Sequence, residues 1–319
     1  MLRLLTKLDV APELALWSYL DSFLSIKRPN SQIRFRQMLS KLCDYLGVAV
    51  NTEHAQKKLL ALTPIDCLDF ISKIKTEGYA DATLLLTFRL LRSIYKRLVD
   101  AKLLTENPWD KIQDSMPREN QIVQVRPTKS ISSKEVKKLL SAPHNLTKDG
   151  IRDRAILAAL FGGGLRRSEV IQLRIEDLER TIDYVGYIKI TQAKGGAHQQ
   201  QAIPEWAHQR LIALKNQRLS EGGRSDSPLF INYSKRGEPG EAISTSGLAS
   251  IFKYWCSKVL GKNLSCHCAR ATAITKLLQD NQPIEKVAEF SRHKNIETVL
   301  IYDKRLKGPS NSIAKNLKY

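Results

Sequence analysis

A short segment without hydrophobic periodicity divides this chain of 319 residues into two parts. Residues 114–130 carry Pro117 and Pro127 among polar side chains, a composition typical of a linker. A single hydrophobic core rarely extends over so long a chain, which instead divides into domains. We therefore expect one domain over residues 1–113 and a second over residues 131–319.

The first part is expected to be a bundle of four helices. Apolar side chains recur at helical spacing in four stretches, which are residues 12–25, 31–46, 63–77 and 80–103. The third stretch begins with Thr63-Pro64-Ile65-Asp66, which predicts an N-cap followed by proline at the first helical position. Asn107-Pro108-Trp109 is expected to stop the last helix.

The second part combines helices with a small sheet. Ser132-Ser133-Lys134-Glu135 resembles a capped helix start, and residues 151–161 are expected to form a largely apolar, buried helix that Gly162–Gly164 ends. Residues 184–190 and 199–203 have the pattern of strands on either side of a turn at Lys194-Gly195-Gly196. Helical patterns return from Trp206 onward, so we expect a fold that is mainly α with a small β-sheet.

Net charge is the most informative bulk property, at +19. The surplus is uneven, because residues 1–120 hold 18 Lys and Arg against 14 Asp and Glu, and the rest of the chain holds 33 against 18. A surplus of this size costs self-repulsion and favours a polyanionic partner, although a generally basic and very soluble protein is the alternative. Charge alone does not identify the nucleic acid.

Other features limit the compartment. The five cysteines are odd in number and lack the spacing of a disulfide framework, which indicates free thiols. The sequence shows no signal peptide and no apolar run of membrane-spanning length, so we expect a cytoplasmic protein without membrane contact.

Several polar residues stand where they could act on a phosphate. Arg166 follows Gly164-Leu165, and Lys194 lies at the tip of the expected hairpin. His267 and Arg270 are three positions apart on an expected helix and therefore share one face. His293 and Tyr302 follow, nine residues apart.

Each of these residues has an ordinary structural interpretation by itself: a surface arginine, a charged turn, a packed tyrosine. The run Cys266-His267-Cys268 also invites a metal site. Adjacent residues diverge on a helix, however, and the sequence offers no second ligand pair at zinc-site spacing. We therefore expect no metal.

In combination, these residues resemble the tyrosine recombinase family, which includes the phage integrases and the Xer-type recombinases. That family has an Arg after Gly-Leu, a Lys on a β-hairpin, His-x-x-Arg, a second His or Trp, and a Tyr nine residues later. The six slots are filled here by Arg166, Lys194, His267, Arg270, His293 and Tyr302. The family usually has glycine before the second His, leucine before the second Arg and often histidine after it, where this chain has Arg292, Ala269 and Ala271.

The resemblance implies an architecture and a partner. Residues 1–113 would be a helical, SAM-like core-binding domain, and residues 131–319 an α+β catalytic domain with a C-terminal tail at 303–319, the two clamping double-stranded DNA. About ten residues precede the first expected helix, so we expect no additional arm-binding domain. Family members act as tetramers on two recombination sites through a Holliday junction, here with a second recombinase or an accessory protein as open alternatives.

The resemblance also implies a mechanism. Tyr302 would attack the scissile phosphate and form a 3′-phosphotyrosyl link, while Arg166 and Arg270 hold the phosphate and Glu169 orients Arg166. His267 would accept the tyrosine proton, Lys194 would protonate the leaving oxygen, and His293 would bind the phosphate. Such chemistry needs no cofactor. Two alternatives remain open, a type IB topoisomerase-like enzyme and a catalytically silent DNA-binding accessory protein.

Overall fold

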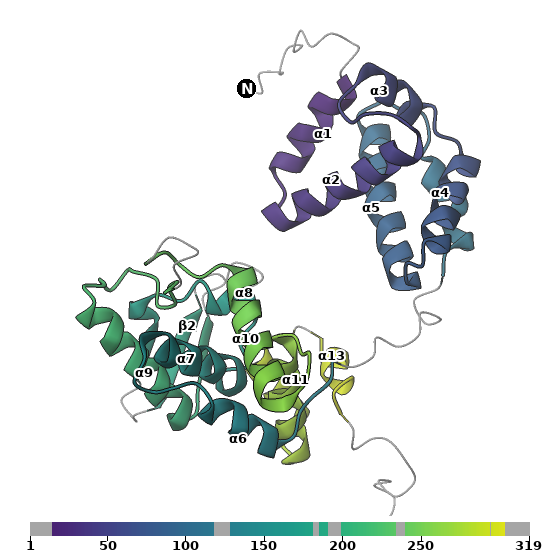
Figure 1. Cartoon of the computed structure of the whole chain (residues 1–319). Helices are drawn as coiled ribbons and strands as arrows, with labels where there is room; N and C mark the ends of the chain where they lie inside the picture. Colours follow the sequence, from purple (N-terminus) through teal and green to yellow (C-terminus); the bar gives the residue numbers. More distant parts are fainter. Residues whose placement is uncertain are drawn as a thin grey trace, which may run out of the picture. The chain divides into compact units, whose positions relative to one another are not determined.

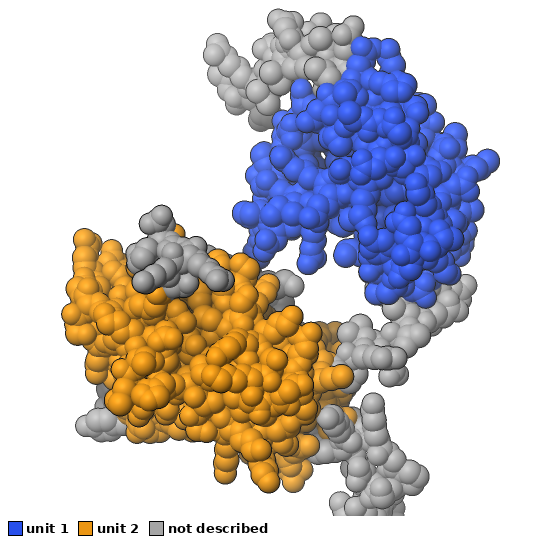
Figure 2. Space-filling view, viewed as in Figure 1, with its two compact units in different colours: residues 1–125 blue, residues 126–319 orange. Residues whose placement is uncertain are grey.

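The structure is a computed structural model that describes residues 15–117, 128–180, 185–190, 199–233, 240–293 and 295–303. Contacts divide the chain into two compact units, residues 1–125 and 126–319 (Figure 2). Both units are largely helical, and a three-stranded sheet belongs to the second (Figure 1). The expectation of a mainly α fold with a small sheet is therefore confirmed. None of the helices in these ranges is long and apolar enough to cross a membrane.

The first unit is a helical bundle whose described part has one more α-helix than expected. Its elements are α1 (Ala15–Ser25), α2 (Pro29–Tyr45), α3 (Glu53–Leu60), α4 (Pro64–Thr76), α5 (Asp81–Asp100) and the 3₁₀ helix η2 (Pro108–Ser115). The prediction of four helices was wrong because it missed α3. That helix is short, and Glu53, Lys57 and Lys58 fill much of its length.

The start of α4 follows the expectation closely. Thr63 accepts a hydrogen bond from the backbone N–H of Asp66, whose carboxylate accepts one in return from the Thr63 backbone. Pro64 occupies the first helical turn, where no N–H is needed. The segment Asn107-Pro108-Trp109 does not end α5 directly. The helix stops at Asp100, and Pro108 instead opens η2.

Trp109 is the centre of the first core. Its side chain is fully buried, and its ring lies about 6 Å from the rings of Phe70, Phe88 and Tyr95, at 6.2, 6.4 and 6.1 Å between centroids. Met116 also packs into this core, although residue 116 falls within the expected linker at 114–130. The beginning of that segment therefore belongs to the first unit, while residues 118–127 lie outside the described ranges.

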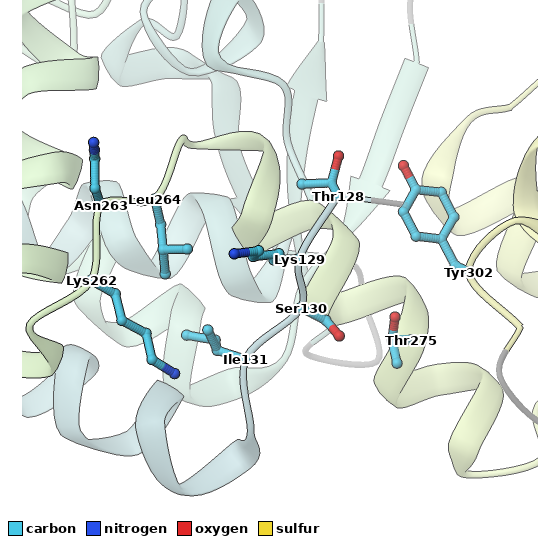
Figure 3. Close-up of a pocket in the computed structure, with 9 residues that line it drawn as sticks. All are labelled: Thr128, Lys129, Ser130, Ile131, Lys262, Asn263, Leu264, Thr275 and Tyr302. Atoms are coloured by element: carbon cyan, nitrogen blue, oxygen red, sulfur yellow. The ribbon is translucent and has the colours of Figure 1, made fainter. Parts of the chain in front are cut away.

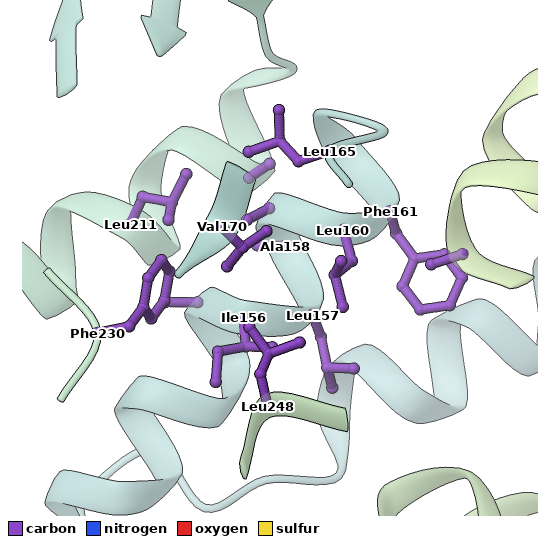
Figure 4. Packing of buried hydrophobic residues seen from close by; sticks show 14 of the residues in the cluster. Ile156, Leu157, Ala158, Leu160, Phe161, Leu165, Val170, Leu211, Phe230 and Leu248 are labelled. Atoms are coloured by element: carbon purple, nitrogen blue, oxygen red, sulfur yellow. The ribbon is translucent and has the colours of Figure 1, made fainter. Parts of the chain in front are cut away.

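The second unit is built around a buried helix, α7 (Lys148–Gly162). Figure 4 shows α7 crossing the middle of the larger core, with apolar side chains from the surrounding elements packed against it. The other helices, given in chain order, are α6 (Ser133–Ser141), α8 (Arg167–Val170), η3 (Ile175–Asp177), α9 (Glu205–Ser220), α10 (Thr245–Leu260), α11 (His267–Gln279), α12 (Ile284–Ser291) and α13 (Glu297–Leu300).

The sheet is antiparallel, in the order β1 (Leu178–Arg180), β2 (Gly186–Ile190), β3 (Gln199–Ala202). The two expected strands correspond to β2 and β3, and Ile190 pairs with Gln199 where they lead into the connection between them. Sequence inspection missed β1, which has only three residues. The expected turn at Lys194-Gly195-Gly196 lies outside the described residues.

Candidate active site

Arg166 lies immediately before α8 and is held by Glu169. Its backbone N–H donates to one carboxylate oxygen of Glu169 at 2.7 Å, and its Nη1 atom donates to the other at 2.8 Å. Burial opposes ionisation of Glu169, but the charge of Arg292, together with the hydrogen bonds and charge of Arg166, outweighs burial and lowers the pKa of this carboxyl. Glu169 is therefore a fixed negative charge that orients the guanidinium of Arg166.

A glycine turn connects α7 with this arginine. Gly164 has a φ of +57°, and a Cβ atom at this position would lie 2.9 Å from the ring of Phe290. The backbone thus has a left-handed conformation at a close contact, which favours glycine on both counts. The Gly164 carbonyl accepts a hydrogen bond from Nη1 of Arg270 at 2.7 Å, so the same turn also fixes the second expected arginine.

Arg270 lies on α11 and is almost completely enclosed, with 1% of its surface exposed. Within the described part of the chain, its Nε and Nη2 atoms have no hydrogen-bond partner. Burial, followed by the charges of Arg166 and Arg292, lowers the pKa of Arg270. Unsatisfied guanidinium N–H groups in a desolvated, positive environment form a site that favours an anion.

His267 and Tyr302 are in direct contact. The Nε2 atom of His267, at the first position of α11, lies 3.1 Å from the phenolic oxygen of Tyr302. Burial raises the pKa of Tyr302, although the charge of Arg270 opposes the rise. Partial desolvation and the charges of Arg270 and Arg166 lower the pKa of His267. A neutral imidazole therefore faces a protonated phenol near neutral pH.

His293 also packs against Tyr302. Its ring is stacked with that of Tyr302 at 6.4 Å between centroids, and its Nδ1 atom lies 2.8 Å from the Ser291 hydroxyl oxygen. Burial and then the charges of Arg270, Arg166, His267 and Arg292 lower the pKa of His293 to about 4. This imidazole is thus also neutral near pH 7.

A small hydrophobic cluster, separate from the main core, positions these groups. It joins α11, α12 and the turn after α13, and its members are Ala271, Ile274, Leu278, Val287, Ala288, Val299 and Tyr302. Because the tyrosine ring is itself part of the cluster, packing orients the phenol toward His267. A cavity of about 480 Å³ opens beside this ring and is lined by Thr128–Ile131, Lys262–Leu264 and Thr275 (Figure 3).

The structure thus brings together five of the six expected catalytic residues, with Glu169 beside them. Lys194 lies outside the described residues, in the eight-residue connection between β2 and β3. All five cysteines are buried and free, including Cys266 and Cys268 next to His267.

Comparison with known proteins decides the family. The model of the phage integrase family matches residues 129–307, which is more than half of the chain and includes all six expected catalytic residues. The chain belongs to the phage integrase family.

Curated members of this family are similar over most of their length. Tyrosine recombinase XerC of Pelotomaculum thermopropionicum is 28% identical over 242 residues, covering 73% of this chain and 74% of the relative. Tyrosine recombinase XerA of Pyrococcus horikoshii is 29% identical over 244 residues, covering 76% of each. This member of the phage integrase family is accordingly a tyrosine site-specific recombinase.

Solved structures support the same fold. The Tn1549 transposon integrase, residues 82–397 in complex with circular intermediate DNA, aligns with a TM-score of 0.65 at 16% identity and covers 95% of this chain and 99% of its own. A λ integrase dimer bound to a COC′ core site aligns with a TM-score of 0.62 at 16% identity, covering 92% and 96%. At these identities, the likeness concerns the fold of the phage integrase family.

Sequence inspection missed three residues at the site of this integrase family member. Arg292 was noted only as a departure from the family pattern, yet its guanidinium binds Glu169. Gln201 on β3 hydrogen-bonds to Arg292, and Ser291 to His293. The one signal available was the long cation in a slot usually filled by glycine.

Proposed function

We propose that this recombinase breaks and rejoins duplex DNA with Tyr302 as its nucleophile. The observation that carries the proposal is the 3.1 Å contact between Tyr302 and His267, next to the unsatisfied N–H groups of Arg270. A tyrosine is a weak nucleophile at its usual pKa and needs a base within hydrogen-bond distance. The neutral His267 has the position and the protonation state of such a base.

Arg166 and Arg270 would stabilise the negative charge that the phosphate carries during the reaction. A phosphodiester repels a nucleophile, and its transition state carries more negative charge than the ground state. Arg270 would donate its free N–H groups to one non-bridging oxygen, and Arg166 the exposed part of its guanidinium to the other. A single preorganised donor of this kind contributes about 3–4 kcal/mol to transition-state stabilisation.

The neutral His293 would donate a third hydrogen bond to the phosphate. Its Nδ1 atom faces the hydroxyl of Ser291 at 2.8 Å. When the hydroxyl donates to Nδ1, the imidazole carries its proton on Nε2, which is then a donor for a phosphate oxygen. The same hydroxyl also lies 3.3 Å from the Ala288 carbonyl oxygen, so this role requires its single proton to point at Nδ1 and not at that carbonyl.

The proposed step balances without a cofactor. The bond from the tyrosine oxygen to phosphorus forms, the bond from phosphorus to the 5′-oxygen breaks, and the phenolic proton moves to His267. Lys194, which belongs to the connection between β2 and β3 in the sequence, would protonate the leaving 5′-oxygen. The phosphotyrosine conserves the energy of the phosphodiester, and attack by another 5′-hydroxyl reverses the step.

Duplex DNA at a recombination site is the proposed partner. The net charge of +19 and the DNA bound by the structurally similar Tn1549 and λ integrases support it. In the first unit, a groove of about 710 Å³ is lined by both basic and acidic side chains. Arg92 and Lys111 form ion pairs with Asp110 and Glu106 there, and Arg89 and Lys96 add further positive charge that suits contact with phosphates. We propose that residues 1–113 bind the duplex, that residues 131–319 perform the chemistry, and that four protomers act on two sites.

Covalent trapping tests the proposal. Wild-type protein and Tyr302→Phe would be incubated with labelled, nicked duplexes drawn from sequence flanking the gene and then separated on denaturing gels. We expect a slow-migrating, protease-sensitive DNA adduct with the wild type alone. Adduct formation by Tyr302→Phe, or none by wild type on DNA that it binds, would contradict the proposal, and the second result would favour a catalytically silent DNA-binding protein.

A further inference from the structure

Arg292 occupies a strained position at the centre of the site. It follows α12 with φ 53° and ψ 42°, a left-handed conformation that glycine adopts freely and that residues with a Cβ atom adopt at a cost. The side chain is nevertheless buried, with 7% exposed. A long cation in a strained and desolvated position costs stability, so its contacts must supply something that glycine would not.

Those contacts reach two other parts of the site. The Nη2 atom of Arg292 lies 2.6 Å from Glu169, on the same carboxylate oxygen that accepts the backbone N–H of Arg166. Its Nη1 atom donates to the side-chain oxygen of Gln201 on β3. Its own carbonyl oxygen lies 3.4 Å from Nη2 of Arg166 and accepts a hydrogen bond from it.

We propose that Arg292 is a positioning residue for the cleavage reaction, which fixes Glu169 and thereby Arg166 and holds β3 against the catalytic helices. This inference rests on the proposed function. Arg292 directly precedes His293, so its backbone conformation also sets the direction in which the His293 side chain points after the end of α12. One residue thus connects Arg166, His293 and the strand that follows the Lys194 segment.

The excess of positive charge around Glu169 distinguishes a positioning role for Arg292 from that of a simple structural ion pair. Glu169 forms ion pairs with Arg166 and Arg292, and the guanidinium of Arg270 is close enough to feel the same charges. If stability alone were at issue, glycine at position 292 would relieve both the strain and the excess positive charge. The arrangement instead places surplus positive charge around the site proposed for the phosphate, where a bound anion would compensate it.

The two interpretations predict different behaviour for Arg292→Gly. A structural ion pair would lose stability, and activity would fall only with the folded fraction. A positioning residue would leave stability unchanged or raised, because the strain is gone, while Arg166 loses its fixed direction. Displacement of a catalytic group by about 1 Å can lower a rate by as much as about a hundredfold.

The test compares Arg292→Gly, Arg292→Lys and Gln201→Ala with wild type in single-turnover cleavage of a nicked duplex. DNA affinity and melting temperature are measured in parallel. Asn281→Gly is the matched control, because Asn281 also has a left-handed backbone conformation (φ 56°) but lies just after the end of α11, away from the site. We expect that Arg292→Gly slows cleavage at saturating DNA by about tenfold or more without weaker binding or lower melting temperature.

Rescue provides the second criterion. Lysine can bind Glu169 with its single ammonium group but cannot bind Gln201 at the same time, as the arginine guanidinium does. Arg292→Lys should therefore cleave faster than Arg292→Gly but more slowly than wild type. Gln201→Ala should lose less than Arg292→Gly, and Asn281→Gly should match wild type. Should Arg292→Gly not fold, a fall in rate for folded Arg292→Lys and Gln201→Ala would still support the inference, and wild-type rates in both would overturn it.

The two failures are distinguishable. If Arg292→Gly cleaved DNA at the wild-type rate, the inference would be overturned and the proposed function would stand. Loss of rate in proportion to loss of folded protein, without rescue by lysine, would also overturn it. No adduct from wild type on any bound DNA would overturn the proposed function, and the inference with it.

Discussion

The Nε2 atom of His267 lies 3.1 Å from the phenolic oxygen of Tyr302, across 35 residues of sequence. The contact joins the first turn of α11 to the turn after α13 through a small separate core. Its direction and distance are those needed to move one proton. Because the proposed reaction depends on this transfer, the protonation state of His267 should govern the rate.

Cleavage should therefore fall in acid. Partial desolvation and the neighbouring arginines lower the pKa of His267 below its usual 6.5, so the imidazole is neutral and able to accept a proton at pH 7. The single-turnover rate should be level near neutral pH and decline only below that usual value, as His267 becomes protonated. His267→Asn should lower the plateau by roughly a hundredfold or more. An unchanged acid decline in this variant would show that another group is the base.

The buried charge of Arg270 should lower the free energy of unfolding of the protein, although we expect the residue to be needed for catalysis. Its guanidinium is buried, Nη1 donates to the Gly164 carbonyl, and among the described residues the other two nitrogens have no hydrogen-bond partner. Arg270→Met keeps the length of the side chain and removes the buried charge, so it should raise the free energy of unfolding by about 1 kcal/mol while abolishing adduct formation. Denaturant unfolding and the trapping assay measure the two effects. A clear loss of stability in Arg270→Met would contradict the prediction, because it would show that the buried guanidinium stabilises the fold.

Much of the site could be predicted because its residues follow local rules. The pair His267 and Arg270 is set by helical spacing, and the glycine turn before Arg166 follows from the end of an apolar helix. The fold class could be predicted for the same reason, since each long helix carries its own apolar period. The short elements α3 and β1 were missed because eight and three residues are too few to establish a period.

The role of Arg292 was beyond sequence inspection for a different reason. Its partner Glu169 lies 123 residues away and Gln201 91 residues away, so no local pattern connects them. Only packing of α12 against the segment after α7 brings the three side chains together. Because the family usually has glycine at this position, its pattern assigns no role to a side chain there.

The first unit should depend on Trp109. Its ring is fully buried among Phe70, Phe88 and Tyr95, so Trp109→Ala should lower the free energy of unfolding of that unit by about 3–5 kcal/mol. The matched control is Trp206→Ala in the second unit, where the tryptophan is 38% exposed and the cost should be smaller. Urea unfolding followed by circular dichroism measures both. Equal losses in the two variants would contradict the assignment of Trp109 as the centre of its core.

DNA binding should weaken steeply with salt. Most contacts proposed for both units are to phosphates, and each neutralised phosphate releases a counterion. The plot of log affinity against log salt concentration should therefore have a slope on the order of −5 or steeper. Filter binding or anisotropy with the nicked duplex at several salt concentrations measures it. A shallow slope would indicate that the surplus of +19 charges is not directed at DNA.

The residues after Tyr302 provide a test of assembly. If the C-terminal tail contacts a neighbouring protomer, deletion of residues 308–319 should reduce recombination by about tenfold or more while DNA binding changes little. The control mixes the truncated protein with full-length Tyr302→Phe on the same DNA. The full-length partner supplies tails but no nucleophile, so cleavage by the truncated protein should partly recover. Unchanged recombination by the truncated protein alone would contradict a role for the tail, and failure of the mixture to recover would place its action within one protomer.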